Sequence, residues 1–222
     1  ERIMASSWEK AYELLSAQVK DMGMDINAIK NELKAQRIET PSWGYGDCGT
    51  RFQVFNCPGA ARNIHEKFED AAVVHKYTGI TPGVAIHIPW DKVENFDSLR
   101  VFAANLGLTL GAVNPNLFQE PEYKFGSACN RDASARRKAV GHMLECIEIM
   151  KTVGSKALSL WFADGINYAG QDSLRERKHR LQDALAEVYA AMPDDSRMLI
   201  EYKCFEPAFY ATDIPDWGVS CL

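Results

Sequence analysis

Short apolar runs alternate with longer segments of helical periodicity through most of this chain, and this alternation limits its possible folds more than any other feature. The apolar runs are residues 83–89, 108–114, 156–163 and 198–203, and residues 41–46 are a candidate for a preceding strand. Strands that alternate with helices are typical of βα units, in which successive strands lie parallel in one sheet. The sequence therefore predicts an α/β fold.

Segments with apolar residues three or four positions apart fill the gaps between these runs, which predicts helices. They are residues 63–77, 96–106, 140–150 with a C-cap at Gly154, and 174–192. Asp172 and Ser173 are capping candidates for the last of them, and Pro193 ends it. Residues 4–37 show the same spacing, interrupted near Gly23, which predicts two helices ahead of the sheet.

Such a chain can form a doubly wound sheet or part of an eight-stranded barrel. No strand is followed by GxGxxG or GxxxxGKS, so the nucleotide-binding signals of open sheets are missing. Polar and aromatic residues gather instead where the strands end, as the pairs His87 and Trp90, Asn114 and Asn116, Trp161 and Asp164, and Glu201 and Lys203. In a (β/α)8 barrel this edge forms the active-site rim, so the barrel is favoured.

The length limits how much of a barrel is present. A complete barrel typically needs about 250 residues, whereas this chain has 222, and its first part is predicted to form helices outside the barrel. We therefore interpret residues 1–40 as an N-terminal helical extension and residues 41–222 as the N-terminal part of a (β/α)8 barrel, with about its first five strands. The chain begins without methionine and ends without a terminal helix, so we expect it to be incomplete.

Charge and composition exclude several classes of protein. The formal net charge is −5 and no long basic run is present, which argues against a nucleic-acid partner. No apolar stretch approaches the ~20 residues that span a bilayer, and the start lacks the apolar core of a secretory signal. We expect a cytoplasmic protein without a membrane partner. The six cysteines form no CxxC pair, so free thiols are expected.

Glu201 and Lys203 are the first candidates for chemistry. They are two residues apart on a predicted strand, so both side chains point to the same side. Inside a barrel, a carboxylate and an ammonium must pair with each other, or with a metal and a substrate, because unpaired burial costs several kcal/mol. The local sequence leaves a simple ion pair at the strand end equally open.

His87 and three tryptophans are candidates for binding a ligand. Trp43, Trp90 and Trp161 each lie at or just after a predicted strand, where indoles can cover the apolar face of a sugar. Aromatic residues are also common in cores, and a lone histidine on a buried strand is often a hydrogen-bonded core residue. The other histidines lie on predicted helices, without metal-ligand spacing, and GxSxG is absent.

Several motifs, taken together and in order, resemble the L-rhamnose isomerase family of the broad-specificity bacterial type, a relative of xylose isomerase. The resemblance runs from about Pro41 to the end of the chain. It is carried by Pro41-Ser42-Trp43-Gly44, Gly49-Thr50-Arg51-Phe52, His87-Ile88-Pro89-Trp90-Asp91-Lys92, Leu144-Glu145-Cys146-Ile147-Glu148-Ile149, Gly154-Ser155-Lys156-Ala157-Leu158 and Glu206-Pro207-Ala208-Phe209-Tyr210.

The resemblance implies a tetrameric barrel enzyme that interconverts an aldose and a ketose with two divalent cations, commonly manganese. It implies that Glu201 ligates the structural metal and that Lys203 lies near the reacting oxygens of the sugar. It implies that His87 contacts the sugar ring or its O5 end. Trp43, Trp90 and Trp161 correspond to aromatic walls of the sugar pocket. The catalytic residues are then Glu201 and Lys203.

The remaining metal ligands of such enzymes lie on later strands, which this chain does not contain. We therefore predict that the 222 residues alone are inactive. A related ketose epimerase is an alternative; it would need a second inward-facing glutamate as base, for which Glu206 and Glu120 are the candidates. A non-catalytic module that binds sugar without metal is a third possibility.

Overall fold

The structure, a computed structural model, describes residues 6–47, 55–206 and 210–221, and the chain divides into two compact units, Glu1–Ile38 and Glu39–Leu222. The first unit contains two helices, α1 (Ser7–Asp21) and α2 (Ile26–Ala35). Between them Gly23 adopts a left-handed conformation, with φ of 74°, which a residue without Cβ adopts readily. The predicted break in this helical segment is confirmed.

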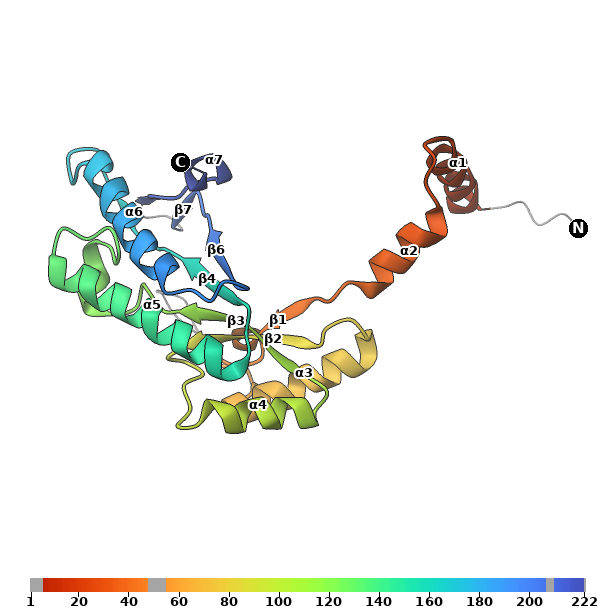
Figure 1. Ribbon diagram of the computed structural model, residues 1–222, viewed down its shortest axis with the longest axis horizontal. Helices are drawn as coiled ribbons and strands as arrows, with labels where there is room; N and C mark the ends of the chain where they lie inside the picture. Colours follow the sequence, from red (N-terminus) through yellow and green to blue (C-terminus); the bar gives the residue numbers. More distant parts are fainter. Residues whose placement is uncertain (1–5, 48–54, 207–209, 222) are drawn as a thin grey trace, which may run out of the picture. The chain divides into compact units, whose positions relative to one another are not determined.

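Five parallel strands form the sheet of the second unit, in the order β1-β2-β3-β4-β6. They are β1 (Glu39–Pro41), β2 (Gly83–Ile88), β3 (Thr109–Pro115), β4 (Ala157–Trp161) and β6 (Arg197–Glu201). Each strand lies beside the next parallel strand along the chain (Figure 1). A doubly wound sheet would reverse its order at a switch point, so the order fits a barrel.

The first strand differs from the prediction for residues 41–46. It ends at Pro41, where a short 3₁₀ helix, η1 (Ser42–Gly44), begins. The buried hydroxyl of Ser42 donates a hydrogen bond to Asp91, and the Tyr45 N–H donates to the Ser42 carbonyl at 3.1 Å. The Tyr45–Ser42 bond takes up backbone groups that a longer strand would pair with β2, so the chain turns away from the sheet here.

Helices follow each of the first four barrel strands in the predicted positions. They are α3 (Ile64–Thr78), α4 (Phe96–Asn105), α5 (Ala133–Val153) and α6 (Leu174–Ala190). Each begins at a polar side chain that accepts a backbone N–H of the first turn, namely Asn63, Asn95, Asp132 and Ser173. The helices contact one another in chain order, α3 with α4, α4 with α5, and α5 with α6 (Figure 1). They therefore form one layer.

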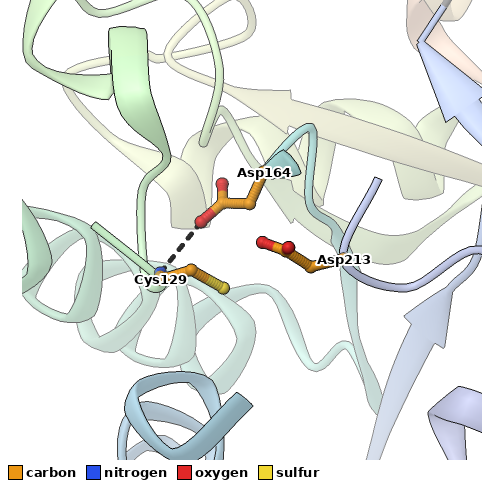
Figure 2. Close-up of side chains that lie close together, drawn as sticks. All are labelled: Cys129, Asp164 and Asp213. Carbon is orange, nitrogen blue, oxygen red and sulfur yellow. Dashed lines mark hydrogen bonds between the residues drawn. The ribbon is translucent and has the colours of Figure 1, made fainter. Parts of the chain in front are cut away.

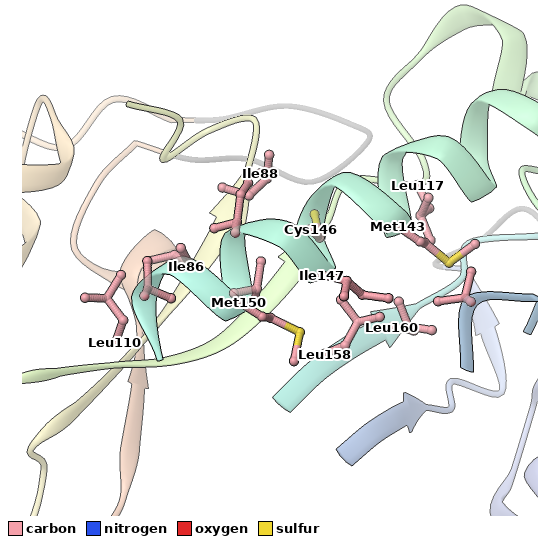
Figure 3. Packing of buried hydrophobic residues seen from close by; sticks show 14 of the residues in the cluster. Ile86, Ile88, Leu110, Leu117, Met143, Cys146, Ile147, Met150, Leu158 and Leu160 are labelled. Atoms are coloured by element: carbon pink, nitrogen blue, oxygen red, sulfur yellow. The ribbon is translucent and has the colours of Figure 1, made fainter. Parts of the chain in front are cut away.

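The core lies between this helical layer and the sheet. The apolar stripe of α5 packs through Met143, Ile147 and Met150, all fully buried, against residues of the strands such as Leu158 and Leu160 (Figure 3). Buried leucine and isoleucine side chains each contribute about 1.5–3 kcal/mol through removal from water. The stripe predicted from sequence is thus the seam that holds the helices on the sheet.

A second, small antiparallel sheet was not predicted. Its order is β5 (Gly165–Ile166), β8 (Tyr210–Thr212) and β7 (Phe205–Glu206), followed by the short helix α7 (Trp217–Ser220). A further 3₁₀ helix, η2 (Pro121–Phe125), follows β3. The small sheet brings the chain after β6 back alongside the segment that follows β4. It therefore supports the strand ends from outside the main sheet.

The described cysteines, Cys57, Cys129, Cys146, Cys204 and Cys221, are free thiols, as predicted. Within the same described ranges, no helix combines the length and the apolar character needed to cross a membrane.

Candidate active site

A pocket of about 260 Å³ opens where the parallel strands end, and all six residues singled out from sequence line it. These strands run in one direction, so their carboxyl ends meet at one edge, as in barrel active sites. The complete lining is Trp43, His87, Trp90, Asn114, Pro115, Phe118, Ser159, Trp161, Glu201 and Lys203. The predicted convergence of Glu201, Lys203, His87 and the three indoles therefore holds in the structure.

Five rings form one side of the pocket, here called the aromatic wall: Trp43, His87, Trp90, Phe118 and Trp161. His87 stacks on Trp90 with 3.9 Å between ring centroids and 19° between planes. Phe118 meets Trp161 edge-on at 4.8 Å, and Trp43 meets His87 edge-on at 5.5 Å. Edge-on and stacked contacts of this kind are the favoured arrangements of aromatic pairs. The wall offers apolar ring faces of the kind that pack on the C–H face of a sugar.

Phe118 is a pocket residue that the sequence analysis missed. It follows β3 by three positions and is buried. Its position just after Asn114 and Asn116, at the end of a predicted strand, could have indicated a pocket residue. Asn114 also lines the pocket, and its amide donates a hydrogen bond to the Ile86 carbonyl at 3.0 Å.

His87 is buried and uncharged. It is 7% exposed, and among the described residues its Nδ1 has no hydrogen-bond partner. Burial lowers the pKa of His87 to about 3, and the nearby His142 and Lys67 act in the same direction. The orphaned Nδ1 does not fit a core histidine satisfied on both nitrogens, because an unsatisfied buried polar atom costs about 1–3 kcal/mol. The Nε1 of Trp161 is orphaned in the same way.

The neutral state of His87 predicts a pH dependence of stability. Its pKa is lowered from 6.5 in the unfolded chain to about 3, so between these values the unfolded state binds more protons. Folding is therefore stabilised fully above pH 6.5 and weakened as pH falls toward 3. We expect the contribution of His87 to lower the free energy of unfolding by about 2 kcal/mol when the pH falls from 7 to 5.

Urea unfolding at both pH values, compared between the wild type and His87→Gln, measures this cost, because all other titrating groups cancel in the difference. His179→Gln, on the exposed surface of α6, is the matched control. An equal pH dependence in the wild type and His87→Gln would contradict a neutral, buried His87.

Glu201 ends the last parallel strand, β6, and Lys203 follows it by two residues. Glu201 lies opposite Trp161 in the register of β6 and β4, and the Lys203 Nζ lies 4.8 Å from the centroid of the Trp161 ring. No ion pair joins Glu201 to Lys203 in the part of the chain that the structure describes. The strand-end ion pair left open by the sequence is therefore not formed, and both side chains face the pocket.

The backbone of Lys203 is held on both sides. Its N–H donates to the Ile214 carbonyl at 3.0 Å, and its own carbonyl accepts the Thr212 hydroxyl. Both partners lie in or next to β8, so the small antiparallel sheet fixes the place from which the Lys203 side chain enters the pocket.

Asp164 does not line this pocket, although it follows the β4 strand end. Figure 2 shows its carboxylate turned toward Cys129 and Asp213, and the candidate ligand atoms of the three lie within 4.8 Å of one another. Asp164 accepts hydrogen bonds from the Ser127 N–H at 2.8 Å, the Ser127 hydroxyl at 2.7 Å and the Cys129 N–H at 2.9 Å. Burial raises the pKa of Asp164 despite these donors.

The cluster of Cys129, Asp164 and Asp213 is already satisfied within the chain. The Asp213 carboxylate lies 2.7 Å from a guanidinium nitrogen of Arg177, whose side chain is 3% exposed. Burial and the nearby carboxylates raise the pKa of the Cys129 thiol well above its usual value, so the thiol stays protonated. The Arg177–Asp213 pair links α6 to the segment that directly follows β8, and we interpret the cluster as part of this buried network.

The two glutamates considered as a second base differ in what the structure shows. Glu120 lies on the surface, 2.8 Å from Lys138, and lines a different cavity. It is therefore misplaced for that role. The Glu206 side chain, residues 49–52 and residues 207–209 lie outside what the structure describes, so these parts of the predicted motifs carry no geometry.

This chain is similar to proteins named as sugar isomerases. The "probable sugar isomerase" of Rhizobium meliloti is 46% identical over 216 residues, covering 95% of this chain and 50% of the relative. A "probable sugar isomerase" of Mesorhizobium japonicum is 43% identical, covering 96% and 51%. The L-rhamnose isomerase of Rhodopirellula baltica is 22% identical over 228 residues, covering 90% and 53%. The chain thus spans about half the length of these relatives.

Solved structures show the fold. An L-ribulose 3-epimerase matches with a TM-score of 0.54 at 15% identity, covering 81% of this chain and 52% of that one. The D-allulose 3-epimerase of a Methylomonas species, solved with D-allulose, matches with a TM-score of 0.57 at 12% identity, covering 84% and 57%. No family model matches the chain. The predicted fold, about the first five strands of a (β/α)8 barrel with helices ahead of it, is confirmed.

Proposed function

We propose that this chain is the N-terminal part of a sugar isomerase that interconverts an aldose and a ketose, L-rhamnose and L-rhamnulose, by a metal-assisted hydride shift. One observation carries the proposal: the six residues singled out from sequence line a single pocket at the carboxyl ends of the strands. The similarity to two proteins named as sugar isomerases supports the reaction class. The choice of L-rhamnose rests on the motifs and on a relative that is 22% identical.

The aromatic wall and His87 bind and orient the sugar in this proposal. Indole and phenyl faces pack on the apolar side of the ring and exclude water, which a hydride shift requires. The neutral imidazole of His87 belongs to this wall and lines the pocket. Its Nδ1 and the Trp161 Nε1 are buried without a hydrogen-bond partner among the described residues.

Glu201 is the residue of this chain that would hold a divalent cation, in our proposal Mn²⁺, with two cations in a complete site. Hard cations prefer carboxylate oxygens, and among the described residues none donates a hydrogen bond to the Glu201 carboxylate. The donor type and its place in the pocket therefore fit. A bound cation supplies Lewis-acid polarisation of the sugar carbonyl and orients the reacting carbons. One carboxylate is too few to hold it alone.

In this mechanism the positive charge of Lys203 stabilises negative charge that develops on the substrate. Its ammonium lies above the Trp161 ring, at the same mouth of the pocket as Glu201. As hydrogen moves between C1 and C2, negative charge builds on the oxygens of those carbons, and a fixed ammonium stabilises it. Its backbone contacts with Thr212 and Ile214 fix the point from which the side chain reaches into the pocket.

Turnover of L-rhamnose to L-rhamnulose, assayed with added Mn²⁺ on the complete product of the gene that encodes this chain, tests the function. The expected result is ketose formation that depends on the metal. Inversion at C3 of a ketose, without aldose formation, would instead establish an epimerase. This alternative is tested because the solved structures of similar fold include two 3-epimerases. Sugar binding without any turnover would establish a binding module.

The ligand count predicts how the 222 residues alone behave. We expect calorimetric titration with Mn²⁺ to show a Kd weaker than about 1 μM, because Glu201 contributes a single carboxylate. Glu201→Gln should remove even this weak binding at the pocket, while Glu120→Gln, on the surface, should leave it unchanged. Binding tighter than about 1 μM by these residues would show that they hold more of the metal site than we propose.

A further inference from the structure

A buried ion pair joins α3 to the turn that follows β2. The Lys67 Nζ lies 2.6 Å from the Asp91 Oδ1, and the two side chains are 4% and 0% exposed. Both charges lose their hydration at such a site, and replacing a pair of this kind with apolar residues is often neutral or stabilising. Stability alone therefore does not explain why the pair lies here.

The second carboxylate oxygen of Asp91 connects two further segments. The Asp91 Oδ2 accepts the backbone N–H of His87 at 2.8 Å and the hydroxyl of Ser42, which is fully buried. Asp91 also donates its own N–H to the His87 carbonyl at 2.8 Å. One carboxylate thus fastens the end of β1, the end of β2 and the side of α3 to one another.

Three rings of the aromatic wall belong to residues that are bonded to Asp91 or lie next to it or to its partners in the sequence. Trp43 directly follows Ser42, Trp90 directly precedes Asp91, and His87 is bonded to Asp91 through its backbone. The rings are in contact as well, through the Trp43 edge on His87 and the stack of His87 on Trp90. Movement of the carboxylate would move all three rings.

We propose that Asp91, held in place by Lys67, is the positioning residue for the Trp43, His87 and Trp90 part of the aromatic wall, and so sets the affinity of the pocket for its sugar. The part of this inference that concerns the sugar rests on the function proposed above. Glu201 ends β6 and Lys203 follows it, and β3 and β4 separate β6 from β2 in the sheet. Loosening the wall should therefore raise KM far more than it lowers kcat.

Two double variants separate the geometry of Asp91 from its charge. In Lys67→Met with Asp91→Asn, the charges are gone, but the side-chain oxygen at position 91 still accepts the His87 N–H and the Ser42 hydroxyl. In Lys67→Met with Asp91→Ala, the charges and the acceptor are both gone. Asp97→Asn, an exposed aspartate paired with Arg100 on α4, is the control for an aspartate substitution as such.

The readouts are the near-UV circular dichroism of the sugar-free protein and KM and kcat for L-rhamnose, measured on the complete gene product. We expect the Asn-containing double variant to keep the aromatic dichroism and a KM close to wild type. We expect the Ala-containing one to lose much of that dichroism and to raise KM between about tenfold and 100-fold. Its kcat should change much less.

Equal dichroism and equal KM in the two double variants would overturn the proposal, and so would an equal fall in kcat without a change in KM. The dichroism needs no sugar. If the wild type fails to turn over L-rhamnose while the two double variants still differ in dichroism, the proposed function fails and the positioning role stands.

Discussion

Lys203→Met should lower kcat by about 100-fold to 1000-fold, the cost of removing one fixed group that stabilises charge in a transition state. Methionine keeps most of the length and the apolar stem of lysine but carries no charge, so the contact with the Trp161 ring survives as packing. The measurement is ketose formation from L-rhamnose at saturating sugar and Mn²⁺, on the complete gene product.

Lys124→Met is the matched control for this variant. The Lys124 ammonium also lies over an aromatic ring, 5.3 Å from the centroid of Phe125, but on the exposed surface of η2 and outside the pocket. We expect it to leave kcat unchanged. A Lys203→Met enzyme with normal kcat and a raised KM would assign Lys203 to sugar binding alone and would contradict its catalytic role.

Arg177→Leu should destabilise the chain by about 3–5 kcal/mol, the usual cost of removing one partner from a buried ion pair. The Arg177 guanidinium bridges Asp172 at 3.2 Å and Asp213 at 2.7 Å, and its side chain is 3% exposed. Without it, the Asp213 carboxylate, which is 8% exposed and lies beside Asp164, has no ion-pair partner among the described residues. Urea unfolding at pH 7 measures the loss.

Arg131→Leu is the control for this loss. Arg131 pairs with the same Asp172 at 2.9 Å, yet its own side chain is 69% exposed. A solvated pair contributes about 0–1 kcal/mol, so the control should lose no more than that. Similar losses in the two variants would show that burial does not govern the strength of this network. The double variant Arg177→Leu with Asp213→Leu should recover part of the loss, because it removes the unpaired charge.

The barrel strands and the helices could be predicted because their signals are local. Periodicity within a single segment, such as the stripe through Met143, Ile147 and Met150, depends only on that segment and on the face it buries. The pocket could be predicted for a related reason: in parallel strands the carboxyl ends must meet, so His87 and Glu201 had to converge.

The parts that sequence did not reveal depend on contacts between distant segments. The strand pairing of residues 165–166 with 211–212 involves too few residues to show a period. From the sequence, Lys67 is expected to be an ordinary surface lysine on an amphipathic helix, and only the fold shows that it is buried against Asp91. Asp164 ends a strand, as a rim residue should, but it turns toward the backbone N–H groups of Ser127 and Cys129 and leaves the pocket.

The order of the main sheet has one more consequence. Among the described residues, β1 and β6 each have a neighbour on one side only, and Leu199 in β6 is 47% exposed. Unpaired strand edges with apolar side chains are templates for pairing with another chain. If no further strands cover these edges, we expect the chain to aggregate at high concentration. Its solubility would then limit how it can be purified and stored.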